Sequence, residues 1–371
     1  MNLDDQHMRL CFALAGQALP QCRPNPAVGC VLVRAGKVIG KGHTQVAGRE
    51  HAEIMALQQA GSRAIGATAY VSLEPCAHHG RTGPCVEALI QAGVERVVYA
   101  LEDPNPLVNG KGLALLRAAG IAVEGPLLAE EAELINPGFN KRMRSGMPYT
   151  RLKLAMSLDG RTAMASGESQ WITGMEARAD VQLLRARSCA VLTGAGTLLK
   201  DDPQLTVRLP EYAGNQPIRV IVDSNMKTPA SAKILQAPGR VLLACAQTAQ
   251  RGAQELHKAA TTSGAELTIK NFADMNGRVD LRVLFRHLAK ELYCNEVLIE
   301  AGATLCGVLM AGGLVDELIV YVAPQLLGSD AQPLLKLPGI KTLADGIRLE
   351  FLDVAMVGKD CRMRLRVLPA A

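Results

Sequence analysis

Aromatic residues are scarce in this sequence of 371 residues, which contains one tryptophan, five phenylalanines and six tyrosines. Lysine and arginine form no long block, and the formal net charge is a mild +5. Proteins that bind nucleic acid without sequence preference combine basic grooves with rings on which bases stack. We therefore expect no nucleic-acid partner. A mild positive charge suits small anionic substrates better than a polyanion.

The chain also lacks a hydrophobic run long enough to suggest a membrane span. Its longest apolar stretch, residues 297–315, contains Glu300 and four glycines, which favours a buried strand, a turn and a helix. The opening "MNLDDQHMRL" places two aspartates ahead of its apolar residues, unlike a signal peptide. Ten scattered cysteines without a secretion signal indicate a reducing compartment with few or no disulfides. We expect a cytoplasmic protein without membrane contact.

Strand and helix patterns alternate in two separate stretches, and the length is too great for one average domain. The alternation weakens before residue 146 and then restarts, so we predict two α/β domains, residues 1–146 and 147–371. In the second domain, Thr173 and Glu176 have the spacing of a capping box for a helix that ends at Arg187.

Two segments of the first domain, "GREHAEIMAL" and "EPCAHHGRTGPC", carry the residue types of a catalytic zinc site. Such a zinc takes three protein ligands and leaves one position open for water. His51, Cys76 and Cys85 supply one nitrogen and two thiolates, and Cys85 opens a predicted helix whose N-terminus favours a thiolate. Glu53 is placed to pass protons between a metal-activated water and a leaving amine. His-x-Glu followed by Pro-Cys and a later Cys is the signature of zinc nucleobase deaminases.

The gap between the two cysteines departs from this signature, because eight residues intervene where the common form has two. Two alternatives remain open: a structural zinc that uses His78 or His79, or three unrelated core residues, since cysteine is common in protein cores. The complete set, in order on strand, loop and helix, favours a catalytic site with one zinc per chain.

At these residues the chain resembles the bifunctional riboflavin-biosynthesis deaminase/reductases, in which the long gap between the cysteines is the family's own form. The resemblance extends over "RPNPAVGCVLV", "GKGHT" and "EDPNPLVNGKG", and through the second domain over "LKLAMSLDGRTAMASGESQWIT" and "EVLIEAGATL". It covers nearly the whole chain. It implies a cytidine-deaminase-like α/β/α domain followed by a dihydrofolate-reductase-like α/β domain.

The resemblance also implies two reactions on a small phosphorylated pyrimidine. The first is hydrolytic loss of ammonia from a 2,5-diamino-6-ribosylaminopyrimidinone 5′-phosphate, and the second is reduction of its ribosyl group to ribityl by NADPH. Matching motifs place Asn25, His43, His78 and Asn105 at the pyrimidine or its ribose phosphate.

The second domain has no GxGxxG fingerprint, so an ordinary Rossmann domain is not supported. Glycine turns ahead of helices, "GAGT" and "AGAT", are weak phosphate signals by themselves. The resemblance places cofactor contacts at Ala155, Trp171, Thr197, Asp201, Ser224, Gly302, Ala303, Thr304 and Leu305. It places substrate contacts at Ser169, Arg185, Leu205, Arg208 and Glu300. Lys153 and Glu300 are expected to assist opening of the sugar and protonation around the imine.

Two other functions compete with this one. A deaminase of free nucleosides or of tRNA would account for the first domain only, and a non-catalytic relative would use both domains for assembly or regulation. The presence of Glu53, Lys153 and Glu300 argues against the second alternative. We expect a homo-oligomer, a dimer formed through the second domain.

Overall fold

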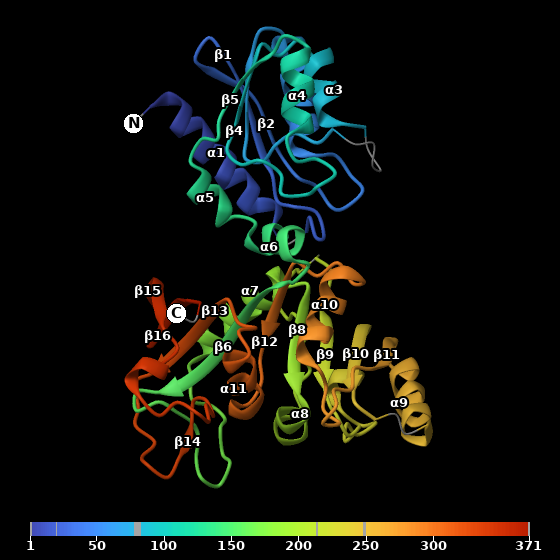
Figure 1. Cartoon of the computed structure of the whole chain (residues 1–371), viewed down its shortest axis with the longest axis vertical. Helices are drawn as coiled ribbons and strands as arrows, with labels where there is room; N and C mark the ends of the chain where they lie inside the picture. Colours follow the sequence, from blue (N-terminus) through green and yellow to red (C-terminus); the bar gives the residue numbers. More distant parts are fainter. Residues whose placement is uncertain (1, 20, 78–82, 213, 248–249, 370–371) are drawn as a thin grey trace. The chain divides into compact units, whose positions relative to one another are not determined.

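The structure is a computed structural model of the whole chain, and it describes residues 2–19, 21–77, 83–212, 214–247 and 250–369. The chain divides into two compact units, residues 1–147 and 148–371. Each unit is built around its own β-sheet (Figure 1). No helix in the described ranges is both long and apolar enough to cross a membrane.

The first unit has a five-stranded sheet in the order β2-β1-β3-β4-β5. β1 runs antiparallel to both β2 and β3, whereas β3, β4 and β5 are parallel. The strands are β1 (Gly29–Arg34), β2 (Lys37–His43), β3 (Thr68–Val71), β4 (Arg96–Tyr99) and β5 (Ala122–Glu124). The α-helices are α1 (Leu3–Ala18), α2 (Ala52–Ala60), α3 (Cys85–Gln91), α4 (Lys111–Ala118), α5 (Ala129–Glu133) and α6 (Pro137–Ser145), and a 3-10 turn, η1, covers Gly61–Ala64.

The sheet of the first unit is covered on both faces, because the side chains of β1 alternate between two apolar layers. Cys30 and Leu32 face a layer formed by α2, α3 and α4. Val31 and Val33 face the opposite layer, to which α1 and α5 contribute. Burial on both faces explains why this strand is almost continuously apolar. The result is the expected α/β/α arrangement.

Helix α2 lies unusually close to β2. A Cβ atom on Gly42 would lie 2.0 Å from the carbonyl oxygen of Ala52, the first residue of α2. Only glycine permits this approach of helix and strand. The close packing fixes the start of α2, and therefore His51, beside the end of β2.

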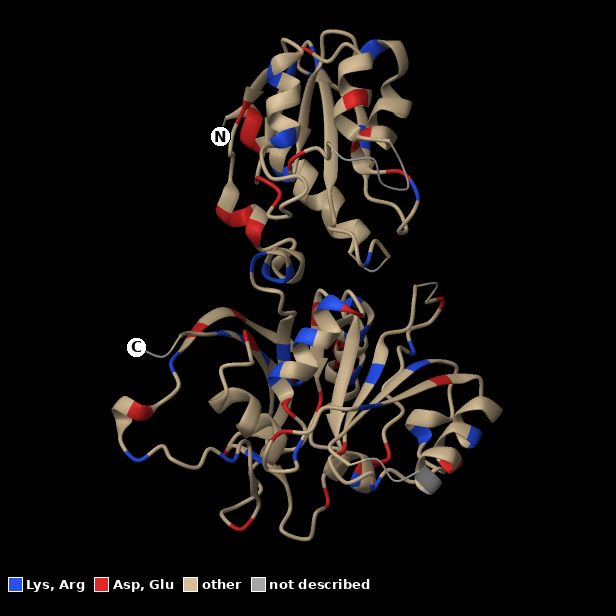
Figure 2. Ribbon diagram, turned by 45° about the vertical axis from the view of Figure 1, so that its right-hand side comes forward, with Lys and Arg blue, Asp and Glu red and all other residues tan. Residues whose placement is uncertain are grey.

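Charge is distributed unevenly at the end of the first unit, where the acidic helix α5 precedes the basic helix α6 (Figure 2). Arg144 of α6 pairs with Glu133 of α5 at 2.5 Å, and Asn140 donates to the same carboxylate at 2.7 Å. Part of the positive charge of α6 is therefore offset by the neighbouring helix α5.

The second unit has a nine-stranded sheet in the order β11-β10-β9-β8-β12-β6-β13-β16-β15, which is parallel from β11 to β13 and antiparallel at β16 and β15. Its strands are β6 (Tyr149–Ser157), β8 (Ala190–Gly194), β9 (Ile218–Val222), β10 (Gly239–Cys245), β11 (Ala265–Asn271), β12 (Glu296–Ile299), β13 (Glu317–Ala323), β15 (Leu349–Val357) and β16 (Asp360–Val367). β7 (Arg161–Ala163) and β14 (Gln332–Pro333) form a separate pair. The helices are α7 (Met175–Arg187), α8 (Ala195–Asp201), α9 (Gln250–Thr262), α10 (Leu281–Lys290) and α11 (Ala303–Ala311), with 3-10 turns η2 (Lys233–Leu235) and η3 (Leu343–Asp345).

The apolar stretch 297–315 forms strand β12, a turn and helix α11, as the sequence predicts. The predicted capping box at Thr173 and Glu176 is wrong. Helix α7 begins one residue later than expected, with Gly174 as its N-cap and no side-chain cap. Instead, the carboxylate of Asp360 accepts the backbone N–H of Gly174 at 2.6 Å. A partner from a distant strand therefore replaces the local cap.

Candidate functional sites

The three predicted metal ligands converge in the first unit. His51 immediately precedes α2, Cys85 is the first residue of α3, and Cys76 lies in the segment between β3 and α3. Their ligand atoms all lie within 4.8 Å of one another. The Nδ1 atom of His51 is 3.5 Å from the Sγ atom of Cys76 and 3.3 Å from that of Cys85.

This donor set fits a tetrahedral zinc ion. Bonds of about 2.3 Å to sulfur and about 2.1 Å to nitrogen place neighbouring ligands roughly 3.6 Å apart. The two nitrogen–sulfur distances are close to that value. Three protein ligands leave the fourth position open, which is the arrangement of catalytic rather than structural zinc sites.

The two thiols are electrostatically unequal. A hydrogen bond from Cys85 lowers the pKa of Cys76 to about 4, with a further contribution from His51 and against the effect of burial. The hydrogen bond to Cys76 and burial raise the pKa of Cys85. A divalent cation between the two sulfurs would stabilise both as thiolates.

Glu53 is the second residue of α2 and its side chain is buried, with 3% exposure. Burial, together with the nearby charge of Cys76, raises the pKa of Glu53 to about 7. A carboxyl group with a pKa near neutrality can both accept and return a proton. Glu53 is not one of the three residues of the ligand group, and its role as a proton carrier stays a prediction.

Three of the four predicted substrate residues of the first unit lie at the same end of its strands. β2, β3 and β4 end at the edge where β1 begins. His43 is the last residue of β2, and Asn25 lies in the segment that leads into β1. Asn105 lies beyond the end of β4, where its Oδ1 atom accepts the N–H of Leu107 at 3.1 Å. His78 lies outside the described residues.

In the second unit, predicted substrate and catalytic residues meet at the carboxyl ends of parallel strands, where α/β proteins bind ligands. Glu300 directly follows β12 and forms a double hydrogen bond with Arg185 of α7, at 2.6 and 2.9 Å. Arg185 also donates to the carbonyl of Thr206 at 3.1 Å. Leu205 is buried in the same loop, and Arg208 is exposed.

Three cations surround Glu300. Burial opposes ionisation of this carboxyl group, but the charges of Arg185, Lys153 and Arg208 outweigh it and lower the pKa of Glu300. Burial lowers the pKa of Lys153, an effect that Glu300 opposes. The ammonium group of Lys153 lies 5.7 Å from the ring centre of Tyr321. Tyr321, which sequence reasoning missed, is buried and donates to Asp180 at 2.6 Å.

The two glycine turns lie next to each other. A Cβ atom on Gly302 would be 3.3 Å from Oγ1 of Thr197, and one on Gly194 would be 3.0 Å from the side chain of Leu305. These contacts bring together the starts of α8 and α11, where the resemblance places the cofactor. The other residues expected there are Ala155 in β6, Asp201 at the end of α8, Ser224 shortly after β9, and Ala303 and Thr304 at the start of α11.

Trp171 and Ser169 lie in the loop between β7 and α7. The indole of Trp171 is 68% exposed, and the guanidinium of Arg178 lies 4.5 Å from its ring centre. Arg178 also donates to the carbonyl of Thr173 at 2.7 Å. An arginine of α7 therefore holds this loop, a contact that the sequence does not reveal.

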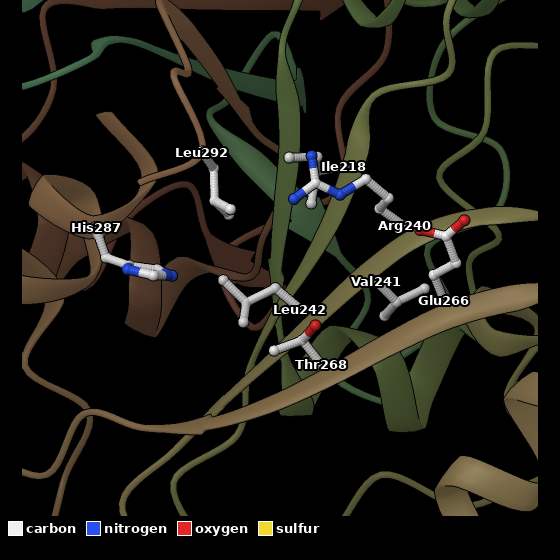
Figure 3. A pocket seen from close by; sticks show the side chains of 8 residues that line it. All are labelled: Ile218, Arg240, Val241, Leu242, Glu266, Thr268, His287 and Leu292. Atoms are coloured by element: carbon white, nitrogen blue, oxygen red, sulfur yellow. The ribbon is translucent and has the colours of Figure 1, made fainter. Parts of the chain in front are cut away.

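One hollow of the second unit contains none of the predicted residues. It spans about 340 Å³, part of which is open solvent, beside β9, β10, β11 and α10 (Figure 3). Arg240 and Glu266 are partners on adjacent strands, and most of the other lining side chains are apolar. The lining residues are Ile218, Arg240, Val241, Leu242, Glu266, Thr268, His287 and Leu292.

Comparison with known proteins separates the chain into the same two parts. Residues 1–101 match the cytidine and deoxycytidylate deaminase zinc-binding region, and residues 148–363 match the RibD C-terminal domain. The riboflavin biosynthesis protein RibD of Escherichia coli is 48% identical, over 98% of this chain and 99% of the relative. That of Haemophilus influenzae is 46% identical, over 96% and 95%.

Solved structures extend this similarity to the fold. RibD of Acinetobacter baumannii is 45% identical and superposes with a TM-score of 0.88, covering 99% of both chains. A diaminohydroxyphosphoribosylaminopyrimidine deaminase/5-amino-6-(5-phosphoribosylamino)uracil reductase from Thermotoga maritima is 29% identical, with a TM-score of 0.85 and the same coverage. Both likenesses span the two units.

Proposed function

The chain belongs to the RibD family, and on that premise we propose that it catalyses two consecutive steps of riboflavin biosynthesis. The first is zinc-dependent hydrolytic deamination of 2,5-diamino-6-ribosylamino-4(3H)-pyrimidinone 5′-phosphate. The second is NADPH-dependent reduction of the ribosyl side chain, which gives 5-amino-6-ribitylaminouracil 5′-phosphate. The observation that carries the proposal is the presence of a His-Cys-Cys group with a buried glutamate in one unit and a Lys-Glu-Arg group in the other.

In the deaminase, His51, Cys76 and Cys85 would hold the zinc ion. When bound, the ion would make a water molecule nucleophilic at neutral pH. Glu53 accepts a proton from that water as the water's oxygen attacks the amine-bearing ring carbon, and passes this proton to the neighbouring ring nitrogen. The second proton of the water is carried by Glu53 to the departing amine. The C–N bond breaks, ammonia leaves, and the ring gains a carbonyl oxygen. Asn25, His43, His78 and Asn105 bind and orient the pyrimidine or its ribose phosphate.

In the reductase, NADPH supplies a hydride when it is bound. Lys153 lies beside Glu300 and can donate a proton as the sugar ring opens to the imine. Glu300 opposes the lowering of the pKa of Lys153 that burial causes, and it is itself held by Arg185. Arg208 is exposed beside this group, where its guanidinium can bind the 5′-phosphate.

The remaining contacts follow from the matching motifs. We propose that Ser169 and Leu205 complete the substrate site together with the charged group around Glu300. Trp171 and the paired turns that contain Thr197 and residues 302–305 bind NADPH. Ala155, Asp201 and Ser224 line the same cofactor site.

The two activities are proposed to belong to separate domains, a deaminase at residues 1–146 and a reductase at residues 147–371. The compact units and the two family matches support this division. A chain that ends near residue 146 should still deaminate, and a chain that begins there should still reduce. If neither fragment is active while the whole chain is, the division is wrong.

We propose that two copies associate through the second unit, in the cytoplasm. β15 is an edge strand of the nine-stranded sheet, and it exposes Phe351, Val354 and Met356 by 64%, 56% and 68%. Exposed apolar edge strands are prone to pair with another chain. Light scattering during size-exclusion chromatography should show a dimer that Met356→Glu dissociates. A wild-type monomer would refute this arrangement.

One assay tests the proposed function against its alternatives. The whole chain is given the diaminopyrimidinone phosphate and NADPH, and ammonia release and NADPH oxidation are followed together. We expect ammonia release first and NADPH oxidation second. Ammonia release from cytidine or from tRNA, without NADPH oxidation, would favour a different deaminase. No turnover of either kind by protein that holds zinc would favour a non-catalytic role.

A further inference from the structure

Glu74 is a buried carboxylate two residues before the ligand Cys76, and no role follows for it from the reaction itself. Its side chain is 3% exposed. Within the described part of the chain, its partners are backbone N–H groups rather than a lysine or arginine. One oxygen accepts from Asp103 at 3.2 Å and Gly110 at 2.9 Å. The other accepts from Gly112 at 2.9 Å and Leu113 at 3.4 Å.

This arrangement makes Glu74 a cap for a helix that is remote in the sequence. Helix α4 begins at Lys111 after Gly110, which has no side chain to cap it. The first N–H groups of a helix need acceptors, and negative charge is favoured beside them. The carboxylate of Glu74 supplies both. A buried carboxylate is tolerated here because four N–H groups surround it.

The same contact holds the start of α4 against the metal-binding segment. A Cβ atom on Gly112 would lie 2.1 Å from the carbonyl oxygen of Pro75, the neighbour of Cys76. Glycine is therefore required at this point, and α4 touches the backbone beside a metal ligand. Substitution at either Gly112 or Glu74 would separate the two segments.

Between its two anchors on Glu74, the loop 103–110 is braced by its own hydrogen bonds. The carboxylate of Asp103 accepts the N–H of Asn105 at 2.8 Å, and Asn109 donates to the carbonyl of Asp103 at 3.1 Å. The loop should therefore move as one piece. Its position relative to Cys76 depends on Glu74.

We infer that Glu74 is a positioning residue of the deaminase, which holds the loop of Asn105 in register with the metal ligand Cys76. This inference rests on the proposed role of Asn105 in binding substrate. Within the described ranges, the hydrogen bonds of this carboxylate go not to a metal ligand but to Asp103, Gly110, Gly112 and Leu113. Glu74 acts by fixing the distance between the loop of Asn105 and Cys76.

The test is Glu74→Gln in the full-length zinc enzyme. The amide keeps the size of the side chain, but one of its two acceptor oxygens becomes an N–H donor that faces backbone N–H groups. Hydrogen exchange should become faster at the four backbone N–H groups of residues 103, 110, 112 and 113. Because a misplacement of about 1 Å can cost roughly a hundredfold in rate, kcat/KM for deamination should fall by about tenfold to a hundredfold. Zinc content and reduction of pre-deaminated substrate should be unchanged.

Glu102→Gln is the matched control, since Glu102 is exposed in the same segment. It should alter neither exchange nor deamination. Faster exchange in Glu74→Gln with undiminished deamination would overturn the inference, and so would unaltered exchange. If Glu74→Gln does not fold, the same measurements are made on Glu74→Asp, which keeps the charge but is one methylene too short to reach both anchors.

A double-mutant cycle with Asn105→Ala shows whether Glu74 acts through the loop. In the Asn105→Ala background, Glu74→Gln should cost less than about threefold, because the contact that it misplaces is already absent. Fully additive losses would overturn the inference. If Asn105→Ala alone leaves deamination unchanged, the assignment of Asn105 to the substrate fails, whereas Glu74 is still judged by its own variant.

Discussion

Arg208 and Arg185 are both expected to bind substrate, but their surroundings predict different consequences of removing them. Arg208 is exposed. Within the described part of the chain, the backbone N–H of Arg208 donates a hydrogen bond to the side-chain oxygen of Gln182 at 2.9 Å. The guanidinium of Arg208 is therefore available for a phosphate. A hydrogen bond to a charged group contributes about 1.5–3 kcal/mol. For an exposed side chain we take the lower figure, about tenfold in affinity.

Arg185 has a structural task in addition. It is 8% exposed, and its three hydrogen bonds join Glu300 and the carbonyl of Thr206. Removing one partner of a buried ion pair typically costs about 3–5 kcal/mol, because the other charge remains buried without compensation. Because Lys153 and Arg208 still partly offset the charge of Glu300, Arg185→Ala should lower the free energy of unfolding of the second unit by the smaller of these figures, about 3 kcal/mol. Turnover should also fall, since Glu300 no longer has a fixed position beside Lys153.

The measurements are urea unfolding of the second unit and steady-state NADPH oxidation with substrate that carries or lacks its 5′-phosphate. Arg208→Ala should raise the apparent KM about tenfold for the phosphorylated substrate, change little without the phosphate, and leave stability unaltered. Arg240→Ala, another exposed arginine of the same unit, should have no effect. If Arg208→Ala still discriminates the two substrates as strongly as wild type, Arg208 does not bind the phosphate. If Arg185→Ala is as stable as wild type, the buried pair of Arg185 and Glu300 does not contribute to the stability of the second unit.

Further outcomes follow from the two sites. Cys85→Ser should lose most of the zinc found by metal analysis of the wild type, because a hard hydroxyl replaces a soft thiolate; full zinc content would remove this residue from the ligand set. Glu53→Gln should retain zinc and reduction but deaminate about a hundredfold to ten-thousandfold more slowly, and a near wild-type rate would exclude it as the proton carrier. Trp171 is the sole tryptophan, so NADPH should change the protein's tryptophan fluorescence in a saturable way, and an unaltered spectrum would place the cofactor elsewhere. Burial opposes ionisation of Glu296, but two arginine charges outweigh it and lower its pKa to about 2. The contribution of ionised Glu296 to the free energy of unfolding should thus be complete above about pH 4.5. It should be lost as the pH falls toward 2. Unfolding measured against pH should show this loss in wild type and not in Glu296→Gln.

The metal site could be predicted because its chemistry limits the choice of residues. Few arrangements of histidine and cysteine can hold zinc, and among the described residues the fold brings His51, Cys76 and Cys85 together. Both α/β domains could also be predicted, since buried strands and amphipathic helices differ in period.

The missed features are contacts between residues that lie far apart in the sequence. Glu300 and Arg185 are separated by 115 positions, and their pairing depends on the packing of α7 against the sheet. The sequence predicts a cap for α7 from nearby residues, whereas Asp360 supplies it from a strand near the C-terminal end of the chain. Glu74 is the first residue of the segment "EPCAHHGRTGPC", but its acceptor role depends on where α4 begins.

The strand order has a consequence for how the protein forms during synthesis. In the first unit, every strand of the sheet has been made by residue 124, so this unit can fold while the ribosome is still producing the rest. In the second unit, the first strand, β6, lies between β12 and β13, which are among the last to be made. About 150 further residues must be synthesised before β6 can pair with either neighbouring strand. Truncated translation products should therefore hold a folded metal-binding unit and an unpaired, aggregation-prone remainder.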